Sequence, residues 1–426
     1  MIKKYRYGEV ANEDIFARTQ MPANVEGIVA DIIENVRQRG DAALQEYSEK
    51  FDCSDAPLEV TAEEIQTAYD SVDPELIQIL EEAAENIRAF HSHQKRNSFI
   101  LNEKPGIVIG QKVLPIERAG LYVPGGTAAY PSTVLMNCIP AQIAGVKEIV
   151  ITTPATGGSI NPVLLAAAKI GGANRIFRVG GAQAIAALAY GTETIPRVDK
   201  IVGPGNAFVA EAKKQVYGMV SIDMIAGPSE ILIVADGTCQ PEVVAADMLS
   251  QAEHDKFATA VLVTDSEKLM DEVADELEDQ LSKLPREEIA RASIDNNGKI
   301  ILADDIQTAI DIANEIAPEH FELCVDNPFD YLDQIKHAGS VFLGKNCPEA
   351  LGDYFAGPNH TLPTNGTARF NSPLSVDDFV KKMQYSYYTE DALTAVADKV
   401  ARFAAEEGLD AHGRSVLIRK NGKDNY

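Results

Sequence analysis

The stretch MLSQAEHDKF, residues 248–257, places several potential metal ligands within a few positions of one another. Gln251 and His254 are three residues apart, a spacing that puts two side chains on one face of a helix. Such a pair can hold a metal ion only with help, because a protein-bound metal needs more than two ligands. The sequence therefore indicates half of a metal site, and the other ligands must come from elsewhere in the chain.

Four of the seven histidines lie among carboxylates, glycines and prolines, which favours a functional site over a structural role. They are His254, His320, His360 and His412. In APEHFEL, Glu319 and His320 follow a proline at which we expect a helix to be interrupted. Asp353 and His360 share the glycine- and proline-rich stretch GDYFAGPNHTLP, which we read as a loop.

Of the histidines not yet placed, His412 is a further candidate, and the other three point away from catalysis. In EEGLDAHG, Glu407 and His412 follow a probable helix end, and they stay candidates. His91 and His93 are two apart, so their rings diverge on a helix, and we expect them at the solvated surface. His337 is predicted late in an amphipathic helix, as a partner of the helix dipole or at the edge of the core.

Nucleophilic catalysis has little support. The sequence contains no GxSxG, and Cys138 lies in an apolar stretch predicted as helix, where a thiol is usually inert. The five cysteines are spread along the chain without a CxxC pair. This pattern predicts free thiols and a reducing compartment, so we expect a cytoplasmic protein.

The length and the net charge of the chain limit the number of folding units and the kinds of partner that we expect. A chain of 426 residues is expected to form two to four folding units. Its formal net charge of −26 disfavours nucleic acid and anionic membranes as main partners. The N-terminal residues lack the apolar core of a signal peptide, and no run of 18 apolar residues predicts a membrane span.

The elements that must position these residues follow an α/β pattern. Residues 20–100 read as helical, with Asp73-Pro74-Glu75 as a helix start. From about 106 to 228, Val- and Ile-rich strands such as GIVIGQKVLPI and EIVITTP alternate with helices, which predicts a buried parallel sheet. A second alternating run extends from SEILIVADG to GSVFLGK, and helix is expected again after about residue 374.

Glycines at the strand-to-helix turns suggest nucleotide binding, since helix N-termini offer free N–H groups to phosphate. The sequence nevertheless lacks GxGxxG after any strand: Gly203-Pro204-Gly205-Asn206 has only GxG, and Gly180-Gly181 is only a pair. These glycines fit tight turns equally well, so both readings stay open, and any nucleotide should bind differently from the standard fingerprint.

Several long motifs, in order along the chain, resemble the histidinol dehydrogenase family. The longest is IDMIAGPSEILIVADGTCQPEVVAADMLSQAEH, residues 222–254. The others are GLYVPGGTAAYPSTVLM (120–136), VGGAQAIAALAYGT (179–192), KIVGPGNAFV (200–209), APEHFEL (317–323), GPNHTLPT (357–364) and EEGLDAH (406–412). The resemblance runs from about residue 20 to the C-terminus.

The resemblance implies an NAD-dependent, four-electron oxidation of L-histidinol through L-histidinaldehyde to L-histidine, in the last steps of histidine biosynthesis. It implies one zinc ion per active site and a homodimer with shared sites. The residues carried over by motif are Gln251, His254, Asp353 and His412 as zinc ligands that also meet substrate; Glu319 and His320 as the acid/base pair, with His320 also on substrate; Ser229, His360 and Glu407 on substrate; and Tyr122, Gln183 and Asn206 on NAD⁺.

The fold that pattern and resemblance together imply is α/β: two incomplete Rossmann-like units with parallel sheets, plus small helical N-terminal and C-terminal extensions. We expect an N-terminal extension at 1–19 and a larger α/β domain at 20–121 with 230–373. A second Rossmann-like domain is expected at 122–229, and a helical tail reaching the partner subunit at 374–426.

Three rival functions use the same residues. One is an NAD-dependent dehydrogenase of another amino alcohol, which a substrate panel would reveal. Another is a metal-dependent hydrolase that needs no nicotinamide, and the third is a non-catalytic nucleotide-binding module. Glu319 and His320, present beside a full set of candidate metal ligands, speak against the last of these.

Overall fold

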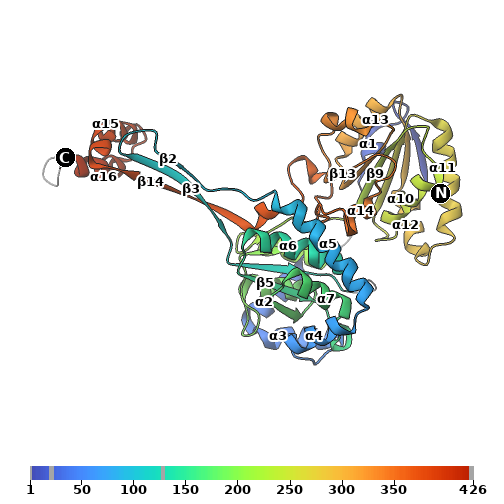
Figure 1. The fold of residues 1–426 in the computed structure, drawn as a ribbon, viewed down its shortest axis with the longest axis horizontal. Coiled ribbons are helices and arrows are strands. Elements are labelled where there is room, and N and C mark those ends of the chain that lie inside the picture. The colour runs from blue at the N-terminus through green and yellow to red at the C-terminus, as the bar shows by residue number, and fades with distance from the viewer. Residues whose placement is uncertain (1, 19–23, 126–129, 422–426) are drawn as a thin grey trace. The chain divides into compact units, whose positions relative to one another are not determined.

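The computed structural model describes residues 2–18, 24–125 and 130–421. The chain divides into two compact units, of which the first comprises Met1–Gln94 with Ile116–Phe379 and the second Lys95–Pro115 with Val380–Tyr426. Figure 1 labels the elements of both units. Whether residues 122–229 fold as a separate domain stays a prediction.

The first unit contains a six-stranded parallel sheet, sheet A, in the order β1-β11-β10-β9-β12-β13. Its central strands are buried from end to end because helices cover both faces. The strands are β1 (Lys3–Arg6), β9 (Glu230–Ala235), β10 (Thr259–Thr264), β11 (Lys299–Leu302), β12 (His320–Cys324) and β13 (Ser340–Leu343).

Helices cover sheet A on both sides (Figure 1). One apolar core includes side chains of α10, α11 and α12, and a different core includes those of α1 and α13. The bounds are α1 (Asn12–Phe16), α10 (Pro241–Ala252), α11 (Glu267–Leu281), α12 (Glu287–Asn297), α13 (Ile306–Ile316) and α14 (Glu349–Tyr354). The second predicted α/β run is thereby confirmed as a buried parallel sheet.

A second parallel sheet, sheet B, has the order β6-β5-β4-β7-β8. Its strands are β4 (Arg118–Tyr122), β5 (Glu148–Thr153), β6 (Arg175–Arg178), β7 (Lys200–Val202) and β8 (Ser221–Ile222). The helices between them are α6 (Pro131–Ala144), α7 (Pro162–Gly171), α8 (Gly181–Tyr190) and α9 (Ala207–Val216). The predicted pair of Rossmann-like α/β units is confirmed.

The N-terminal helices pack on sheet B. Their bounds are α2 (Glu26–Arg39), α3 (Asp41–Tyr47), α4 (Ala62–Ser71) and α5 (Pro74–Ser92). Helices α2 and α3 share one core with α8 and α9, and α4 and α5 share the other with α6 and α7. We expected residues 20–121 to join the other sheet. Their apolar faces instead bury themselves here, a pairing that helical periodicity cannot specify.

The start of α5 follows the sequence prediction. Asp73 caps the helix by accepting a hydrogen bond from the Glu75 N–H at 2.9 Å, and Pro74 occupies the first turn. Shorter turns complete the first unit. They are a π-helical turn at Ser48–Asp52 and 3-10 turns at Thr156–Gly158, Pro328–Asp330, Leu332–Gln334, Thr367–Arg369 and Val376–Phe379.

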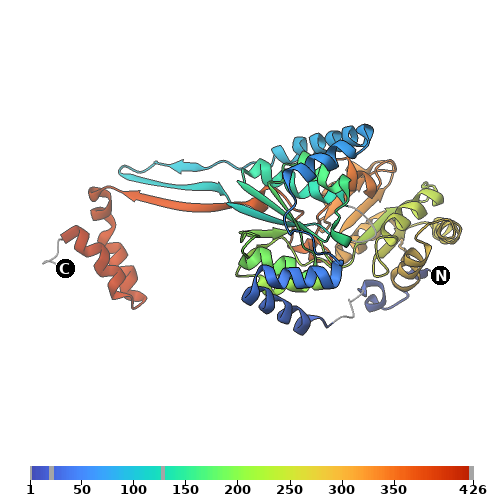
Figure 2. The same cartoon turned by 90° about the horizontal axis from the view of Figure 1, so that it is seen from below.

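The second unit is an antiparallel sheet followed by two helices. Figures 1 and 2 show β14 (Val380–Tyr388) running beside β3 (Ile107–Pro115), with β2 (Phe99–Leu101) on the other side of β3. Helices α15 (Glu390–Glu406) and α16 (Asp410–Asn421) follow β14 and pack on each other.

Two sequence predictions are wrong in this unit. The GIVIGQKVLPI strand was expected in the parallel sheet, but as β3 it pairs antiparallel with β14, from Ile107 opposite Tyr388 to Pro115 opposite Val380. Helix was expected from about residue 374, whereas β14 is a strand. The tyrosines of β14 favour a strand, but its lysines do not, and the segment lacks a clear apolar alternation. The partner strand β3, far away in sequence, supplies its hydrogen bonds.

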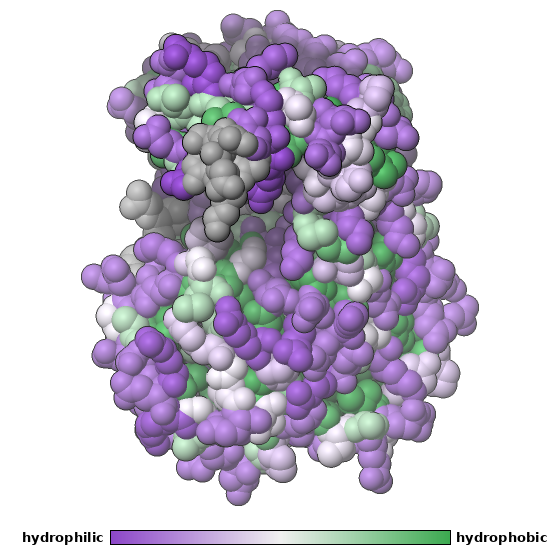
Figure 3. Space-filling model, turned by 90° about the vertical axis from the view of Figure 1, so that its left-hand side faces the viewer, coloured by the Kyte–Doolittle hydropathy of each residue, from purple (hydrophilic) through white to green (hydrophobic). Residues whose placement is uncertain are grey.

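None of the described helices is long and apolar enough to cross a membrane. On the face drawn in Figure 3, hydrophilic side chains predominate and hydrophobic ones gather in smaller patches between them. This surface agrees with the large excess of acidic residues in the sequence.

The turn after β7 provides a test of the fold. Gly203 has a φ of +109°, and a Cβ atom placed there would lie 2.1 Å from the Tyr122 carbonyl oxygen. Gly218 has a similar φ of +99°, but a Cβ there meets nothing within 4 Å. Gly218→Ala is expected to cost about 1–2 kcal/mol from backbone strain alone. Gly203→Ala should cost about 1–3 kcal/mol more through the clash.

Thermal unfolding of both variants checks this expectation. The apparent midpoint should fall in the order wild type, Gly218→Ala, Gly203→Ala. Equal midpoints for the two variants would mean that the approach of Gly203 to Tyr122 does not constrain the fold.

Candidate functional site

A cavity of about 550 Å³ lies within the first unit, lined by residues from the segments around both parallel sheets. Most of the predicted site residues line it. They are Asn206, Ser229, Gln251, His254, Glu319, His320, Asp353 and His360. Residues that are distant in sequence therefore lie around one cavity. They are the residues that chemical type and motif singled out in the sequence.

The elements of sheet A explain how several of these side chains come together. Glu230 begins β9 and His320 begins β12, and the two strands are parallel with His320 opposite Ile231. Gln251 lies in the last turn of α10, and His254 follows its end. Because α10 leads from the carboxyl end of β9 back to the start of β10, its C-terminus arrives at the amino-terminal edge of the sheet. The candidate site therefore forms at this edge.

Gln251 is the least expected member of the site. Its side chain is completely buried, yet neither Oε1 nor Nε2 has a hydrogen-bond partner within the described structure. A buried amide left without partners costs free energy, so such a group in a folded protein calls for an explanation. A ligand of the cavity, a metal ion above all, would supply the missing interaction.

Three side chains form a group able to hold a metal ion. One ligand atom each from His254, Glu349 and Asp353 lies within 4.8 Å of the others. His254 and Asp353 were predicted as ligands from the sequence, and Glu349 was missed. Asp353 was expected in a loop but lies on α14, where Glu349 is four residues earlier and so on the same helical face. That i, i+4 spacing is the signal that could have identified Glu349.

Glu349 connects this group to the buried Glu322 and, through Ser250, to the main chain of the half-buried Asp247. Glu349 accepts a hydrogen bond from Ser250 Oγ at 2.8 Å, and its N–H donates to Glu322 Oε1 at 2.6 Å. Burial raises the pKa of Glu349 to about 8 and that of Asp247 to about 6, and it raises the pKa of Glu322 well above its usual range. The sequence offered no sign of this acidic cluster.

His320 is held in one orientation by the main chain. Its Nδ1 lies 3.0 Å from the carbonyl oxygen of Glu230. A carbonyl can only accept, so neutral His320 carries its proton on Nδ1 and leaves a lone pair on Nε2. Nε2 has no hydrogen-bond partner in the described structure and lies 3.9 Å from Asp353 Oδ1. Burial lowers the pKa of His320 to about 4, which keeps the ring neutral near pH 7.

Glu319 lies beside this ring. Its Oε2 accepts a hydrogen bond from the Glu230 N–H at 2.9 Å and lies 3.7 Å from His320 Nδ1. Burial raises the pKa of Glu319 well above its usual range. The predicted helix interruption is confirmed, because α13 ends at Ile316 and Ala317 adopts a φ of +50°. This break turns the chain so that Glu319 and His320 enter the cavity at the start of β12.

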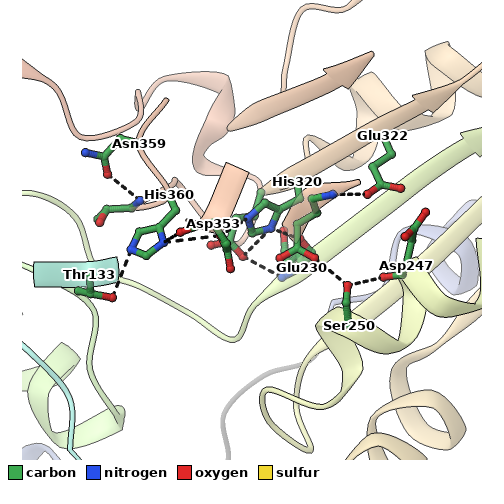
Figure 4. A network of polar contacts seen from close by, with 12 residues as sticks. Thr133, Glu230, Asp247, Ser250, His320, Glu322, Asp353, Asn359 and His360 are labelled. Atoms are coloured by element: carbon green, nitrogen blue, oxygen red, sulfur yellow. Dashed lines mark hydrogen bonds and ion pairs between the residues drawn. The ribbon is translucent and has the colours of Figure 1, made fainter. Parts of the chain in front are cut away.

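His360 bridges the segments of the two sheets. Its Nδ1 lies 3.1 Å from the Asp353 carbonyl oxygen, and its Nε2 lies 3.2 Å from Thr133 Oγ1 on α6. Burial lowers the pKa of His360. Figure 4 shows His360 between Thr133 and Asp353, with His320 on the other side of Asp353. His360 lies in a loop, as predicted, and Ser229 lines the same cavity just before β9.

The three residues predicted to contact NAD⁺ follow strands of sheet B or lie at a strand end. Tyr122 ends β4, Gln183 is in the first turn of α8 after β6, and Asn206 caps α9 after β7. The chain runs from β4 outward to β6 and then returns to the other side of β4 with β7. The crevice at the carboxyl ends of such diverging strands is where open α/β sheets bind dinucleotides.

Tyr122 and Gln183 do not line the large cavity among the described residues, whereas Asn206 does. The Tyr122 hydroxyl accepts a hydrogen bond from the Gly181 N–H at 3.1 Å. A Cβ at Gly181 would lie 2.8 Å from Gln183 Oε1, so both side chains surround this glycine. Gly181 has a φ of +66°, a conformation that favours glycine in the turn leading into α8.

Glu407 and His412 belong to the second unit and are not among the residues that line the cavity. Glu407 directly follows α15, as predicted for a residue at a helix end. His412 also lies beyond the end of α15, as predicted, and is in the first turn of α16, because the chain resumes a helix at Asp410 after the turn at Gly408.

Three other sequence predictions have clear outcomes. His91 was expected at the surface but is completely buried, with Nδ1 2.7 Å from Gln94 Oε1. Its side of α5 packs into the core, whereas His93 is exposed as predicted. His337 lies in a bend, not a helix. The cysteines are free, and Cys138 is buried in α6, where desolvation raises the pKa of its thiol.

Comparison with known proteins agrees with the geometry. The family model described as histidinol dehydrogenase matches residues 17–420. The chain is 56% identical to histidinol dehydrogenase of Clostridium acetobutylicum over 390 residues, covering 91% of this chain and 90% of that one. It is also 56% identical to the Geobacillus kaustophilus enzyme over 393 residues, with coverages of 92% and 93%.

A solved structure supports the same assignment. The crystal structure of histidinol dehydrogenase from Elizabethkingia anophelis matches with a TM-score of 0.92 and 41% identity, covering 98% of both chains. Its likeness therefore extends over both units described above. Sequence, fold and candidate site together place this chain in the histidinol dehydrogenase family of NAD-dependent oxidoreductases.

Proposed function

We propose that the protein oxidises L-histidinol to L-histidine through L-histidinaldehyde, with NAD⁺ accepting the hydride in each of two successive oxidations. The observation that carries this proposal is the pairing of His320, whose buried Nε2 has no hydrogen-bond partner in the described structure, with the buried Glu319 beside a group of potential metal ligands. Family membership supports the substrate, and the free cysteines support a reducing cytoplasm as the compartment.

Zinc is the metal that we propose for the site, and the residues present fit it. His254 and Asp353 are suitable ligands, and the unpartnered Gln251 amide supplies a neutral oxygen. Glu349, which lies within the same group, offers the metal a further carboxylate oxygen. When bound, zinc supplies positive charge that orients the imidazole and amine nitrogens of the substrate.

His412 completes the proposed ligand set from a second subunit. In the chain described here His412 belongs to the second unit and His254 to the first. A homodimer in which each tail serves the partner's site would bring the two together. The same arrangement would deliver Glu407 to the substrate of the partner.

In the first oxidation His320 acts as the base. An alcohol loses hydride poorly while its hydroxyl is protonated, so a base must take that proton as the hydride leaves. Nε2 of His320 has the free lone pair that this requires, because Nδ1 is committed to the Glu230 carbonyl. Burial keeps the imidazole neutral and therefore ready to accept the proton.

In the second oxidation Glu319 acts on water. The aldehyde must be hydrated before a second hydride can leave, and Glu319 takes a proton from the attacking water. Burial raises the pKa of Glu319, so its ionised form is a stronger base than an exposed carboxylate. His320, protonated in the first oxidation, returns its proton to the aldehyde oxygen as water adds, which completes the hydrate and frees Nε2 again. His320 then takes a hydroxyl proton of the hydrate as the second hydride leaves. Contacts within the cavity would hold the aldehyde in place between the two steps.

The stoichiometry of NADH formation tests the function. With Zn²⁺ and excess NAD⁺, each histidinol consumed should yield two NADH, read at the absorbance band of NADH. Removing the metal with a chelator should abolish the reaction, and Zn²⁺ should restore it. One NADH per substrate would indicate a simple alcohol dehydrogenase. Absence of NAD⁺ binding by calorimetry would favour a metal-dependent hydrolase.

Replacement of Glu319 separates the two oxidations. Glu319→Gln should slow the oxidation of supplied histidinaldehyde by roughly 100-fold or more, while affecting the oxidation of histidinol to aldehyde much less. His320→Gln should slow both, because both need its Nε2. Single-turnover NADH formation with each substrate measures the rates. Glu253→Gln, just beyond α10, is the matched control and should leave both rates unchanged.

The outcome that contradicts this assignment is equal slowing of the two oxidations by Glu319→Gln. Glu319 would then serve both steps alike and would not be the residue that activates water.

Mixed subunits test whether the active sites are shared. His254→Ala and His412→Ala homodimers should each lose zinc and activity. After the two variants are unfolded, mixed and refolded together, a mixed dimer contains one site with both histidines intact. Random mixing should therefore restore up to about a quarter of the wild-type activity and bound zinc. His93→Ala, an exposed histidine outside the site, is the control. No recovery, with mixed dimers shown by tagged chains, would contradict shared sites.

A further inference from the structure

Glu230 contacts both residues of the proposed acid/base pair through its main chain. Its N–H donates to Glu319 Oε2 at 2.9 Å, and its carbonyl oxygen accepts from His320 Nδ1 at 3.0 Å. The two peptide groups that flank one Cα atom therefore determine which oxygen of Glu319 stays free and which nitrogen of His320 carries the proton. A small rotation of the backbone at Glu230 would disturb both residues at once.

The side chain of Glu230 is anchored on the other side of the strand start. Its Oε1 accepts hydrogen bonds from Arg18 Nη1 at 2.7 Å and from the Asn365 N–H at 3.2 Å. The carboxylate side chain is only 10% exposed, and burial raises its pKa while Arg18 opposes that rise. Arg18 is thus the cation that compensates a buried charge directly behind the two proposed catalytic residues.

Arg18 is itself brought to this position by a fixed stretch of chain. Strand β1 pairs with β11, and Ile15 of α1 is almost completely buried. Lys299 of β11 donates from Nζ to the carbonyl oxygens of Asp14, Ile15 and Ala17, at 3.2, 2.8 and 2.8 Å.

The guanidinium of Arg18 makes a second contact besides the one with Glu230. Its guanidinium also donates to the carbonyl oxygen of Ile316, the last residue of α13. The helix that ends there leads directly into Glu319 and His320. Arg18 therefore ties the N-terminal segment both to Glu230 and to the backbone just before the proposed acid/base pair.

We propose that Arg18 is a positioning residue for the oxidation: through Glu230 it holds the peptide groups that orient Glu319 and His320. This inference rests on the proposed function, because it takes the roles of Glu319 and His320 from it. Arg18 touches neither substrate nor cofactor in this scheme. Its effect should therefore appear in the rate of the chemical steps and hardly in binding.

The test compares Arg18→Met with Arg369→Met. Arg369 also binds the end of α13, donating to the Glu315 carbonyl oxygen at 2.8 Å and to its carboxylate at 2.9 Å, and its hydrogen bonds in the described structure do not reach Glu230. Arg18→Met should lower kcat for histidinol by roughly 10- to 100-fold, the scale of a small misplacement of catalytic groups. The KM values for histidinol and NAD⁺ should change by less than about threefold. Arg369→Met should retain wild-type kcat.

Two further variants distinguish positioning from general destabilisation. Arg18→Lys keeps the charge and should recover part of the lost kcat. Glu230→Gln keeps the size of the side chain but not its charge, and it should lower kcat like Arg18→Met. The double variant should be little worse than either single one, because both act through the same contact. If Arg18→Met does not fold, as judged by thermal unfolding, Glu230→Gln carries the test.

The outcomes are distinct. A wild-type kcat in folded Arg18→Met overturns the inference, and if that variant does not fold, a wild-type kcat in folded Glu230→Gln does so. The inference also fails if the loss of transition-state stabilisation in the double variant equals the sum of the losses in the two single variants. A loss of kcat equal to that in Arg369→Met also overturns it, because the effect would then come from the end of α13. If wild-type protein forms no NADH from histidinol, the proposed function itself fails, and the role of Arg18 fails with it.

Discussion

The parallel pairing of β9 with β12 is the interaction on which the candidate site depends. It sets Glu319 and His320 beside the peptide groups of Glu230, so that one strand start holds the side chains of the next. A slip of one residue in this pairing would move His320 to the opposite face of the sheet and break both hydrogen bonds. The helices and sheets around these strands serve to maintain this single register.

Burial then gives these groups their chemical character. The same desolvation acts in opposite directions on an acid and on an imidazole, because it disfavours the charged form of each. It raises the pKa of Glu319 and lowers that of His320, so burial favours the uncharged form of both neighbouring groups. The acids at Asp247, Glu322 and Glu349 experience the same effect, which limits the negative charge collected near His254 and Asp353.

The two parallel sheets contribute different edges to the proposed reaction. Sheet A presents the amino-terminal ends of β9 and β12, whereas sheet B presents the carboxyl ends of β4 and β7. The first edge carries the proposed acid/base and metal residues, and the second carries the residues predicted to meet NAD⁺. Thr133 and His360 join the segments around the two sheets by a 3.2 Å contact. A hydride donor and its acceptor can meet only if both edges face a common cavity, and Asn206 lines that cavity with His320.

By itself, the sequence determined the α/β class, the alternation of strands and helices, the helix break before Glu319 and, through long motifs, the family. These features follow from local periodicity, turn residues and runs of side chains that are read along the chain. Only the tertiary structure decided that β14 is a strand of the antiparallel sheet, that His91 is buried and that Glu349 joins His254 and Asp353. It also decided that Glu230 supports the acid/base pair from behind. The physical reason is that strand pairing, desolvation and the clustering of distant side chains depend on which surfaces pack together, and a local pattern does not specify its partner.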